Sequence, residues 1–407
     1  MPGIALLDNP VQEYAWGSRT FIPRLLGKPF PAATPQAELW MGAHPHGTSR
    51  VLRDGRWVPL SDLIKKDPSG ILGKSTAARF SNRLPFLFKV LAASKPLSIQ
   101  AHPNQGQALE GFEREEKQAI ALSAHDRNYR DPFHKPEILC ALTPFWVLKG
   151  FRAMHEIRSI LSRIGFRAAD LPHLQEKDEK GFRKTITALF TMCREEQRRL
   201  VSGLVSAVAA HPSSDPVFEW MIRLQEDFPD DLGVLGPVLL NLILLQPGEA
   251  LSIAPGELHS YLDGAGIEVM ANSDNVLRGG LTEKHLDVHE LLKILNFSPG
   301  ERKILHPRLQ GSAEWLYPEG SEEFLLSRMS LEHGMLHQSP VNRSVEIMIC
   351  VQGEAELSDT ETGRTLSLRC GSSIMVPASA KGYCLRGAGT LYKASVPLKK
   401  SAGFYGT

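Results

Sequence analysis

The chain has 407 residues, with 46 Lys and Arg residues against 45 Asp and Glu residues, and 42% of its residues are hydrophobic. This composition is typical of a folded protein and excludes a fibrous or disordered chain. A net charge of +1 also argues against a nucleic-acid-binding protein, which usually has a basic surplus to neutralise phosphates. Because a single core rarely extends beyond about 250–300 residues, we expect two or three domains.

The N-terminus lacks the basic stretch followed by an apolar stretch that marks a secretory signal. No apolar run reaches the roughly 18 residues of a membrane-spanning helix. We therefore expect a cytoplasmic protein without a membrane partner. The five cysteines are odd in number and show no CxxC spacing, which argues against a disulfide framework and a thiolate zinc site, so we expect buried thiols.

The first part of the chain reads as short strands separated by turns. Apolar runs at 84–91 and 97–101 are bounded by Pro and by Asn-Gln-Gly, which is typical of strands. The pattern changes at about Met154, where apolar residues over 157–164 recur at i, i+3, i+4 and i+7 before Gly165. This spacing predicts an amphipathic helix.

Further helices follow the first one. A second helix is predicted from Ile186 to Val201, and a third around 218–224. We therefore predict an all-helical module over 152–230, inserted between strand-rich segments. The apolar run at 238–245 then suits a strand buried on both faces, although periodicity alone does not exclude a helix.

Beyond residue 320 the sequence predicts short, regularly spaced strands. They lie at 324–331, 345–351, 354–357, 365–368 and 373–377. Such spacing favours a jelly roll or sandwich. A turn leads into an apolar strand ending in Pro both at 246–255 and at 370–378, and this similarity indicates two related barrels.

Gln100 and His102 form a polar pair within an apolar run. On a strand both side chains project to the same face, because side chains alternate with a period of two, so both could reach one metal. Ser98 shares that face, and three polar groups on one side of an apolar strand indicate a polar pocket. The alternative is a hydrogen-bonded pair without a metal, since a QxH pattern alone is a weak signal.

A second polar cluster contains His134, Lys135 and Glu137, in a segment that Pro132 and Pro136 hold extended. Glu137 leads directly into an apolar strand, so its carboxylate could point inward. Burial tolerates a carboxylate only beside a cation or a metal. An exposed charged loop is an equally good interpretation.

The third cluster runs from His259 to Lys284. Its glycines and the short polar side chains at 272–275 also suit a surface loop. A loop does not explain why Glu268, Arg278 and Lys284 accompany them. These three residues could together transfer protons and bind an anionic substrate group.

The three clusters offer four candidate metal ligands, Gln100, His102, Glu137 and His259. Two imidazoles, one carboxylate and one amide oxygen suit a divalent first-row metal, and a set without thiolates is typical of a catalytic zinc site. The residues alone do not distinguish zinc from manganese, iron or cobalt. With one anionic ligand, a bound dication would leave a positive site that favours oxygen-rich or phosphorylated substrates.

Several strings match the pattern of one known family. They are Ala37-Glu-Leu-Trp-Met-Gly42, Phe88-Lys-Val-Leu91, Lys95-Pro-Leu-Ser-Ile-Gln-Ala-His-Pro103, His134-Lys-Pro-Glu137 and the stretch from His259 to Lys284. From Tyr14 to the C-terminus the chain resembles type I mannose-6-phosphate isomerases. The resemblance implies a zinc enzyme with one Zn²⁺ per chain that interconverts mannose 6-phosphate and fructose 6-phosphate through a cis-enediol.

The resemblance also implies a mainly β fold with two cupin barrels (jelly-roll, double-stranded β-helix) and an inserted α-helical domain. Residues 1–151 together with 231–320 would form the metal-binding cupin, 152–230 the helical domain, and 321–407 a C-terminal cupin without metal. The last part has no His after Val341, which agrees with one metal per chain.

The resemblance places zinc on the same four ligands and the key arginine at Arg278. As the base that moves the proton between C1 and C2, our first choice is Glu268; a metal-bound water and His134 are alternatives. Lys135 and Lys284 are expected to hold the phosphate, with Ser98 lining the pocket.

Two positions depart from the family pattern. Phe133 stands where Asn commonly precedes the His-Lys-Pro-Glu string, so we expect a changed contact beside the site without loss of the metal. Glu283 stands where Pro is common, which puts little in doubt. A metal-dependent cupin oxygenase and a non-catalytic sugar-binding cupin are the alternative functions, and a monomer that acts on a small phosphosugar is expected.

Overall fold

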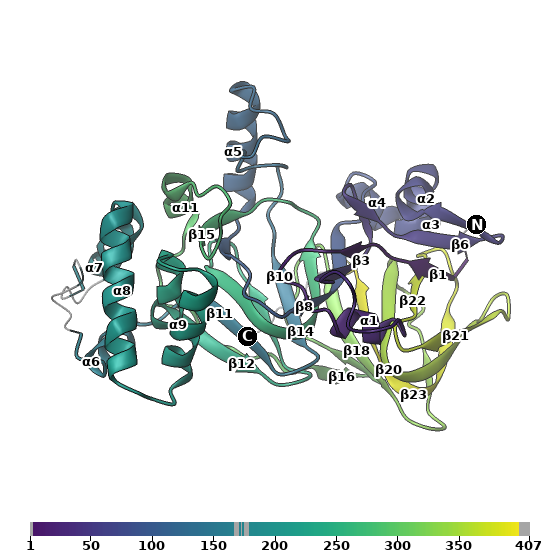
Figure 1. The fold of residues 1–407 in the computed structure, drawn as a ribbon. Coiled ribbons are helices and arrows are strands. Elements are labelled where there is room, and N and C mark those ends of the chain that lie inside the picture. Colours follow the sequence, from purple (N-terminus) through teal and green to yellow (C-terminus); the bar gives the residue numbers. More distant parts are fainter. Residues whose placement is uncertain (1–2, 167–170, 172, 175–178, 399–407) are drawn as a thin grey trace.

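Two β-sheets, of ten and eleven strands, form most of the molecule, and a group of helices lies at one end (Figure 1). The computed structural model describes residues 3–166, 171, 173–174 and 179–398. The mainly β character predicted from the sequence is confirmed. None of the helices in the described residues combines the length and the apolar character needed to cross a bilayer.

The ten-stranded sheet contains the strands next to the predicted polar clusters. Its main order is β12-β11-β14-β8-β3-β2, and β9, β10, β13 and β15 pair at its sides. The predicted strands at 84–91 and 97–101 are confirmed, as β8 and β9. The bounds are β2 Val11–Gln12, β3 Glu38–Met41, β8 Phe86–Ala93, β9 Ile99–Ala101, β10 Glu137–Ala141, β11 Phe145–Phe151, β12 Leu240–Leu245, β13 Ala250–Ile253, β14 His259–Ala271 and β15 Leu277–Gly280. A separate hairpin pairs β4 Ala43–His44 with β5 Gly47–Thr48.

The eleven-stranded sheet combines both ends of the described chain. Its main order is β16-β17-β18-β23-β20-β22-β1-β6-β7, with β19 and β21 at its sides. The bounds are β1 Ala5–Asp8, β6 Arg50–Arg53, β7 Arg56–Pro59, β16 Arg308–Gln310, β17 Glu314–Leu316, β18 Leu325–Leu331, β19 Leu336–Gln338, β20 Glu346–Asp359, β21 Thr365–Arg369, β22 Ser373–Val376 and β23 Tyr383–Ser395.

Strand β1 departs from the predicted division of the chain. We placed all of 1–151 with the metal-binding part, but Leu6 in β1 pairs with Ile374 in β22, and β6 and β7 extend the same sheet. Sheet pairing therefore crosses the predicted division at these strands, and the division itself stays a prediction. Pairing with β1 satisfies backbone groups that would otherwise be an exposed edge of β22.

One strand replaces two predicted ones in this sheet. We expected separate strands at 345–351 and 354–357, whereas β20 runs continuously from Glu346 to Asp359. A register shift between Cys350 and Gln352 lets its pairing with β23 continue, as a bulge does.

Four helices lie in the region of the predicted helical module, with a break where one continuous helix was expected. Its helices are α6 Met154–Ser162, α7 Glu179–Thr191, α8 Arg194–Ala210 and α9 Pro216–Asp227. The predicted second helix, 186–201, is two helices, because Cys193 adopts an extended conformation and begins α8. The Cys193 backbone N–H donates to the Glu196 carboxylate at 3.2 Å, which satisfies one free donor at the helix start.

Other helices carry little apolar periodicity and were not predicted. They are α1 Phe21–Leu25, α2 Leu60–Lys66, α3 Pro68–Leu72, α4 Lys74–Arg79, α5 Gln105–Lys117, α10 Gly236–Leu239, α11 Val288–Ile294 and a 3₁₀ turn at Leu232–Leu235. The first residues of the predicted strand at 238–245 belong to α10, and the strand β12 begins at Leu240. Asn104 and Gln107 form a reciprocal cap at the start of α5, which is a signal that was present in the sequence.

The thiols and the surface charges also bear on the sequence predictions. Cys140 and Cys350 are buried as expected, but Cys193 and Cys370 are exposed and Cys384 is half-buried, so the prediction of five buried thiols is wrong.

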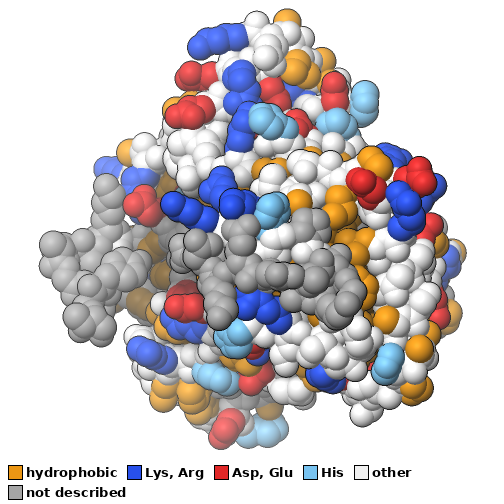
Figure 2. Space-filling view, turned by 90° about the vertical axis from the view of Figure 1, so that its left-hand side faces the viewer, with side chains coloured by type: hydrophobic (Ala, Val, Ile, Leu, Met, Phe, Trp, Pro, Cys, Tyr) orange, Lys and Arg blue, Asp and Glu red, His pale blue; other side chains and the backbone are white. Residues whose placement is uncertain are grey.

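On the face shown in Figure 2, side chains of both signs are intermixed, in keeping with the near-neutral net charge.

A substitution at Gly353 in β20 tests whether that strand is continuous. Its φ is +69°, and an added Cβ would collide with the backbone carbonyl oxygen of Ala388 in β23. We expect Gly353→Ala to lower the free energy of unfolding by about 1–3 kcal/mol more than Gly334→Ala, because Gly334 has a similar φ of +82° but open space around it. Denaturant unfolding of both variants measures the difference. Equal losses would show that no close approach exists at Gly353.

Candidate metal centre and active site

Three buried side chains from separate parts of the sequence meet where β9 and β10 pair with β14 in the ten-stranded sheet. His102 follows β9, Glu137 begins β10, and His259 begins β14. The His102 Nε2 atom lies 3.3 Å from Glu137 Oε1, and His259 Nε2 lies 3.4 Å from Glu137 Oε2. Within the described ranges, this is the one compact His, Cys, Asp and Glu group that could hold a metal ion.

Strand pairing brings the fourth predicted ligand to the same place. Gln100 in β9 pairs with His259 of β14 on one side and with Arg278 of β15 on the other. Directly paired residues project to the same face of a sheet, so the three side chains share one face. The amide nitrogen of Gln100 lies 3.4 Å from His259 Nε2, and a flip of the amide would turn its oxygen to the cluster instead.

Backbone carbonyls fix both imidazole rings. The His102 Nδ1 atom donates to the carbonyl of Asn275 at 2.7 Å, and His259 Nδ1 donates to the carbonyl of Glu257 at 3.0 Å. The proton therefore lies on Nδ1 in each ring, and the Nε2 lone pairs face Glu137. His102 Nε2 is buried without a hydrogen-bond partner, as expected of a ligand atom that serves a metal.

The protonation states also suit a cation. Burial lowers the pKa of His102 to about 4, which keeps its ring neutral. Burial alone would raise the pKa of Glu137, but the ammonium of Lys135 holds it well below its usual range, so the carboxylate is ionised. Neutral imidazoles beside an ionised carboxylate are the forms in which these groups bind metals.

Asn275 holds the loop that supports this cluster, and the sequence did not single it out for this role. Its side-chain oxygen accepts from the backbone N–H of Arg130 at 2.7 Å, and its amide donates to the carbonyls of Asp131 and Phe133. Since its own carbonyl orients His102, Asn275 links the segment before Glu137 to the imidazole. Its complete burial agrees with this positioning role.

Lys89 forms a second buried network with two carboxylates. The Nζ atom lies 3.0 Å from Glu268 Oε2 and 3.4 Å from Glu38 Oε1, and the indole of Trp40 donates to Glu38 at 2.6 Å. Burial raises the pKa of Glu268, while the carboxylates outweigh burial and raise the pKa of Lys89. The candidate base Glu268 is thus held by Lys89.

Lys89 and Glu38 were missed as site residues. The available signal was a lysine inside the otherwise apolar run of β8, all of whose residues are buried. A buried ammonium requires a carboxylate partner, and periodicity does not say which one.

A group of cations lies next to the metal cluster. Arg278 has no carboxylate partner among the described residues. Asp274, four residues earlier in the chain, contacts His44 and His46 instead. Burial, and then the neighbouring Arg130, lower the pKa of Arg278. Burial, Arg278 and Arg130 likewise lower the pKa of Lys284. Cations that repel one another without a carboxylate between them form a site for an anion.

The remaining predicted residues lie in different surroundings. Lys135 is buried with its Nζ 3.2 Å from Glu137 Oε1, so it belongs to the metal cluster rather than to the group around Lys284. His134 turns the other way, with Nε2 2.8 Å from Glu323 Oε1. Ser98 is half-buried just before β9, close to Gln100 in the chain.

Phe133, the departure from the family pattern, contacts an arginine beside the site. Its ring lies under the guanidinium of Arg83, whose Cζ is 4.1 Å from the ring centroid, in a cation–π contact. Its backbone carbonyl accepts hydrogen bonds from the side chains of Ser273 and Asn275, and so helps to hold the loop that contains them. The side chain at 133 is therefore a neighbour of the site, whereas its main chain supports it.

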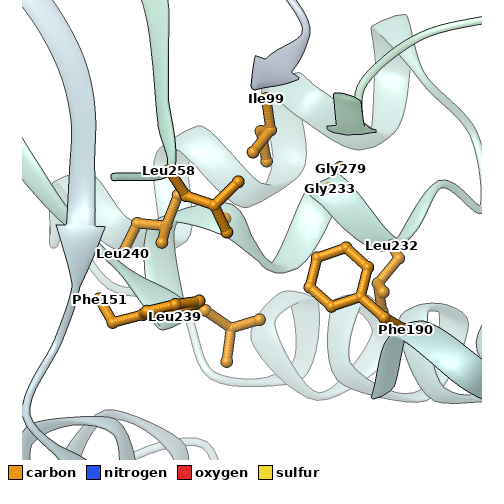
Figure 3. A pocket seen from close by; sticks show the side chains of 10 residues that line it. Ile99, Phe151, Phe190, Leu232, Gly233, Leu239, Leu240, Leu258 and Gly279 are labelled. Carbon is orange, nitrogen blue, oxygen red and sulfur yellow. The ribbon is translucent and has the colours of Figure 1, made fainter. Parts of the chain in front are cut away.

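Apolar side chains fill the opposite face of the site strands (Figure 3). Ile99, Leu258 and Gly279 are the direct neighbours of Gln100, His259 and Arg278 in the chain, and they line a cavity of about 20 Å³ together with side chains of the helical region. This space holds no more than a water molecule. It is therefore an apolar backing that packs the site strands, and not a substrate pocket.

The fold and the site define a mainly β protein with a buried centre for a divalent metal, bordered by unpaired cations. A family model described as the catalytic domain of type I phosphomannose isomerase matches residues 4–154. The chain is 40% identical over 389 residues to a mannose-6-phosphate isomerase of Escherichia coli, covering 95% of this chain and 97% of that one. It is 32% identical to the human enzyme of that name, covering 93% and 94%. The chain belongs to the type I phosphomannose isomerase family.

Solved structures give the same result. A variant of the phosphomannose isomerase of Salmonella typhimurium matches with a TM-score of 0.90 and 37% identity, over 98% of this chain and all of that one. A mannose 6-phosphate isomerase described as holo and zinc-bound matches with the same score, identity and coverage.

The network around Lys89 can be tested by removing its charge. Lys89→Met leaves two buried carboxylates without their cation, so we expect the free energy of unfolding to fall by about 3–5 kcal/mol. The control is Lys95→Met, which removes an exposed ion pair with Asp227 and should cost about 0–1 kcal/mol. Denaturant unfolding compares them, and equal stabilities would contradict the buried network.

Proposed function

We propose that this protein interconverts mannose 6-phosphate and fructose 6-phosphate, with one Zn²⁺ bound by Gln100, His102, Glu137 and His259. The observation that carries the proposal is the buried His102 Nε2 atom, which faces an ionised carboxylate without a hydrogen-bond partner, in a chain of the phosphomannose isomerase family. Two imidazoles, a carboxylate and an amide oxygen fit zinc while leaving a position for substrate oxygens.

We also propose that each large sheet closes into a cupin barrel and that α6 to α9 form an inserted helical domain. The support is the run of consecutive helices between β11 and β12, and the antiparallel pairing of strands from distant parts of the chain in each sheet. In this division β1, β6 and β7 belong with the C-terminal barrel. A monomeric state and a cytoplasmic location remain predictions from the sequence.

The isomerisation moves a proton between C2 and C1 of the sugar through an enediol that carries negative charge on its oxygens. Zinc, when bound, polarises the carbonyl and hydroxyl oxygens of the substrate. Arg278 projects from β15 on the same face as Gln100 and His259, where its permanently charged guanidinium can stabilise the developing charge.

Glu268 is the proposed base. Burial raises the pKa of its carboxyl, which makes it a better proton acceptor, and Lys89 keeps the carboxylate in place at 3.0 Å. His134 is less suited, because its ring contacts Glu323. The pocket side chain of Ser98 and the buried Lys135 would orient the sugar hydroxyls near the metal.

The phosphate of the substrate is assigned to Lys284, together with Arg130. These cations lie near Arg278 and share no carboxylate, so a dianion relieves their mutual repulsion. The earlier pairing of Lys135 with Lys284 as phosphate ligands is thereby revised, since Lys135 already contacts Glu137. A site for a dianion is not expected in an oxygenase or in a binding module for neutral sugars. Neither alternative function is therefore favoured.

The proposed function predicts a strict requirement for the metal and for His102. A coupled assay with mannose 6-phosphate should show full activity that a chelator abolishes and zinc restores. His102→Ala should lose both zinc, measured by elemental analysis, and turnover, whereas His125→Ala should change neither, because His125 is 90% exposed. Zinc-loaded protein without turnover of mannose 6-phosphate would sink the proposal.

Arg278→Lys separates a catalytic arginine from a structural one. Lysine keeps the charge but loses the planar fork, so we expect kcat to fall by roughly 10²–10³, as on removal of an oxyanion donor. Zinc content and melting temperature should stay close to those of the unaltered protein. A lower melting temperature with near-normal kcat in the folded fraction would instead identify a structural role.

A further inference from the structure

A short turn at 254–257 contacts the segments that carry both imidazole ligands of the proposed metal centre. The Gly256 backbone N–H donates to the backbone carbonyl of His102 at 2.7 Å. The backbone carbonyl of Glu257 accepts from His259 Nδ1 at 3.0 Å. The turn therefore fixes the backbone at one imidazole ligand and the ring orientation of the other.

The carboxylate of Glu257 holds this turn through two contacts. Its Oε2 atom accepts from the backbone N–H of Ala254 at 3.2 Å, so the turn is closed on itself. Its Oε1 atom lies 3.0 Å from the Nζ atom of Lys149 in β11. Only 13% of the Glu257 side chain and 8% of the Lys149 side chain are exposed. Solvent and salt screen such a pair much less than an exposed one, so it can hold a fixed geometry.

Lys149 ties the turn to the sheet that carries the metal ligands. It pairs directly with His259 where β11 lies against β14. Its ammonium also donates to the backbone carbonyl of Glu301 at 3.2 Å, which fixes the side chain at a second point. The next residue, Gly150, has a φ of +60°, and an added Cβ would lie 2.8 Å from Glu257 Oε1. The strand therefore leaves space for the Glu257 carboxylate beside Lys149.

We propose that the Lys149–Glu257 ion pair is a positioning element of the metal centre and raises its affinity for Zn²⁺. The pair holds the 254–257 turn where its backbone fixes His102 and His259, so the ligand atoms need less rearrangement when the metal binds. This inference rests on the proposed function, because it takes both imidazoles as zinc ligands.

The charge of Lys149 alone would have the opposite effect. An ammonium near a bound dication repels it, so removal of that ammonium should by electrostatics alone strengthen zinc binding. Loss of positioning should instead weaken zinc binding. The variant Lys149→Met therefore distinguishes a positioning role from a purely electrostatic one by the sign of the change in affinity.

The test measures the dissociation constant of the full chain for Zn²⁺ by competition with a chromophoric chelator. The main variant combines Lys149→Met with Glu257→Gln, which removes both charges of the pair, leaves neither ion unpaired, and lets residue 257 keep its contact with Ala254. We expect its Kd for Zn²⁺ to rise about tenfold or more, as on loss of other groups that orient metal ligands. Lys149→Met alone should also raise the Kd. The absorption spectrum of the Co²⁺-loaded double variant should shift, because it reports the geometry of the ligands.

The matched control combines Lys393→Met with Glu314→Gln in the eleven-stranded sheet. This ion pair has similar burial, with 4% and 12% of the side chains exposed and 2.8 Å between Nζ and Oε1. The control should leave the Kd for Zn²⁺ and the Co²⁺ spectrum unchanged, even where it lowers the melting temperature.

Three results would overturn the inference. They are a Kd of the Lys149 and Glu257 double variant within about twofold of the unaltered chain, tighter binding by Lys149→Met alone, and an equal loss of affinity in the control. An unaltered chain that binds no Zn²⁺ would overturn the proposed function together with this inference, so the two failures are distinguishable.

Discussion

The position of the short strand β9 between β14 and β15 is the constraint on which the site depends. Its pairing sets Gln100 opposite both His259 and Arg278, so an amide, an imidazole and a guanidinium share one face. A shift of one residue would turn all of these side chains to the opposite face, since the pleat has a period of two. The apolar neighbours Ile99, Leu258 and Gly279 favour the observed register, because they pack against the helical region.

Burial then determines the chemistry that this arrangement can support. In a low-dielectric interior an ionised carboxylate is stable only with partners, and Glu137 has Lys135 and two imidazoles around it. Glu268 is equally buried, and its carboxylate can carry a negative charge because the ammonium of Lys89 lies beside it. Two equally buried carboxylates thus acquire opposite pKa shifts, one lowered and one raised. Such divergence between neighbouring groups is typical of catalytic sites.

The two large sheets share a hydrophobic core, which couples the metal centre to the rest of the chain. Phe88 and Ile267 from the ten-stranded sheet pack in one cluster with Ile347 and Met375 from the other. Polar contacts cross the same boundary, among them the 2.8 Å contact from His134 to Glu323. The metal-binding segment is therefore supported by residues from the C-terminal part, as well as by its own strands.

The sequence by itself determined the mainly β class, the helices near 154–162 and 216–227, and the polar residues that interrupt apolar strands. These features depend on periodicity, which reports only neighbours along one strand or helix. The tertiary structure alone decided that Lys89 meets Glu268, that Lys135 joins Glu137 instead of Lys284, and that β1 pairs with β22. Lys89 and Glu268 are 179 residues apart in the chain. The reason is that a buried charge requires a partner, while local sequence does not specify which distant segment supplies it.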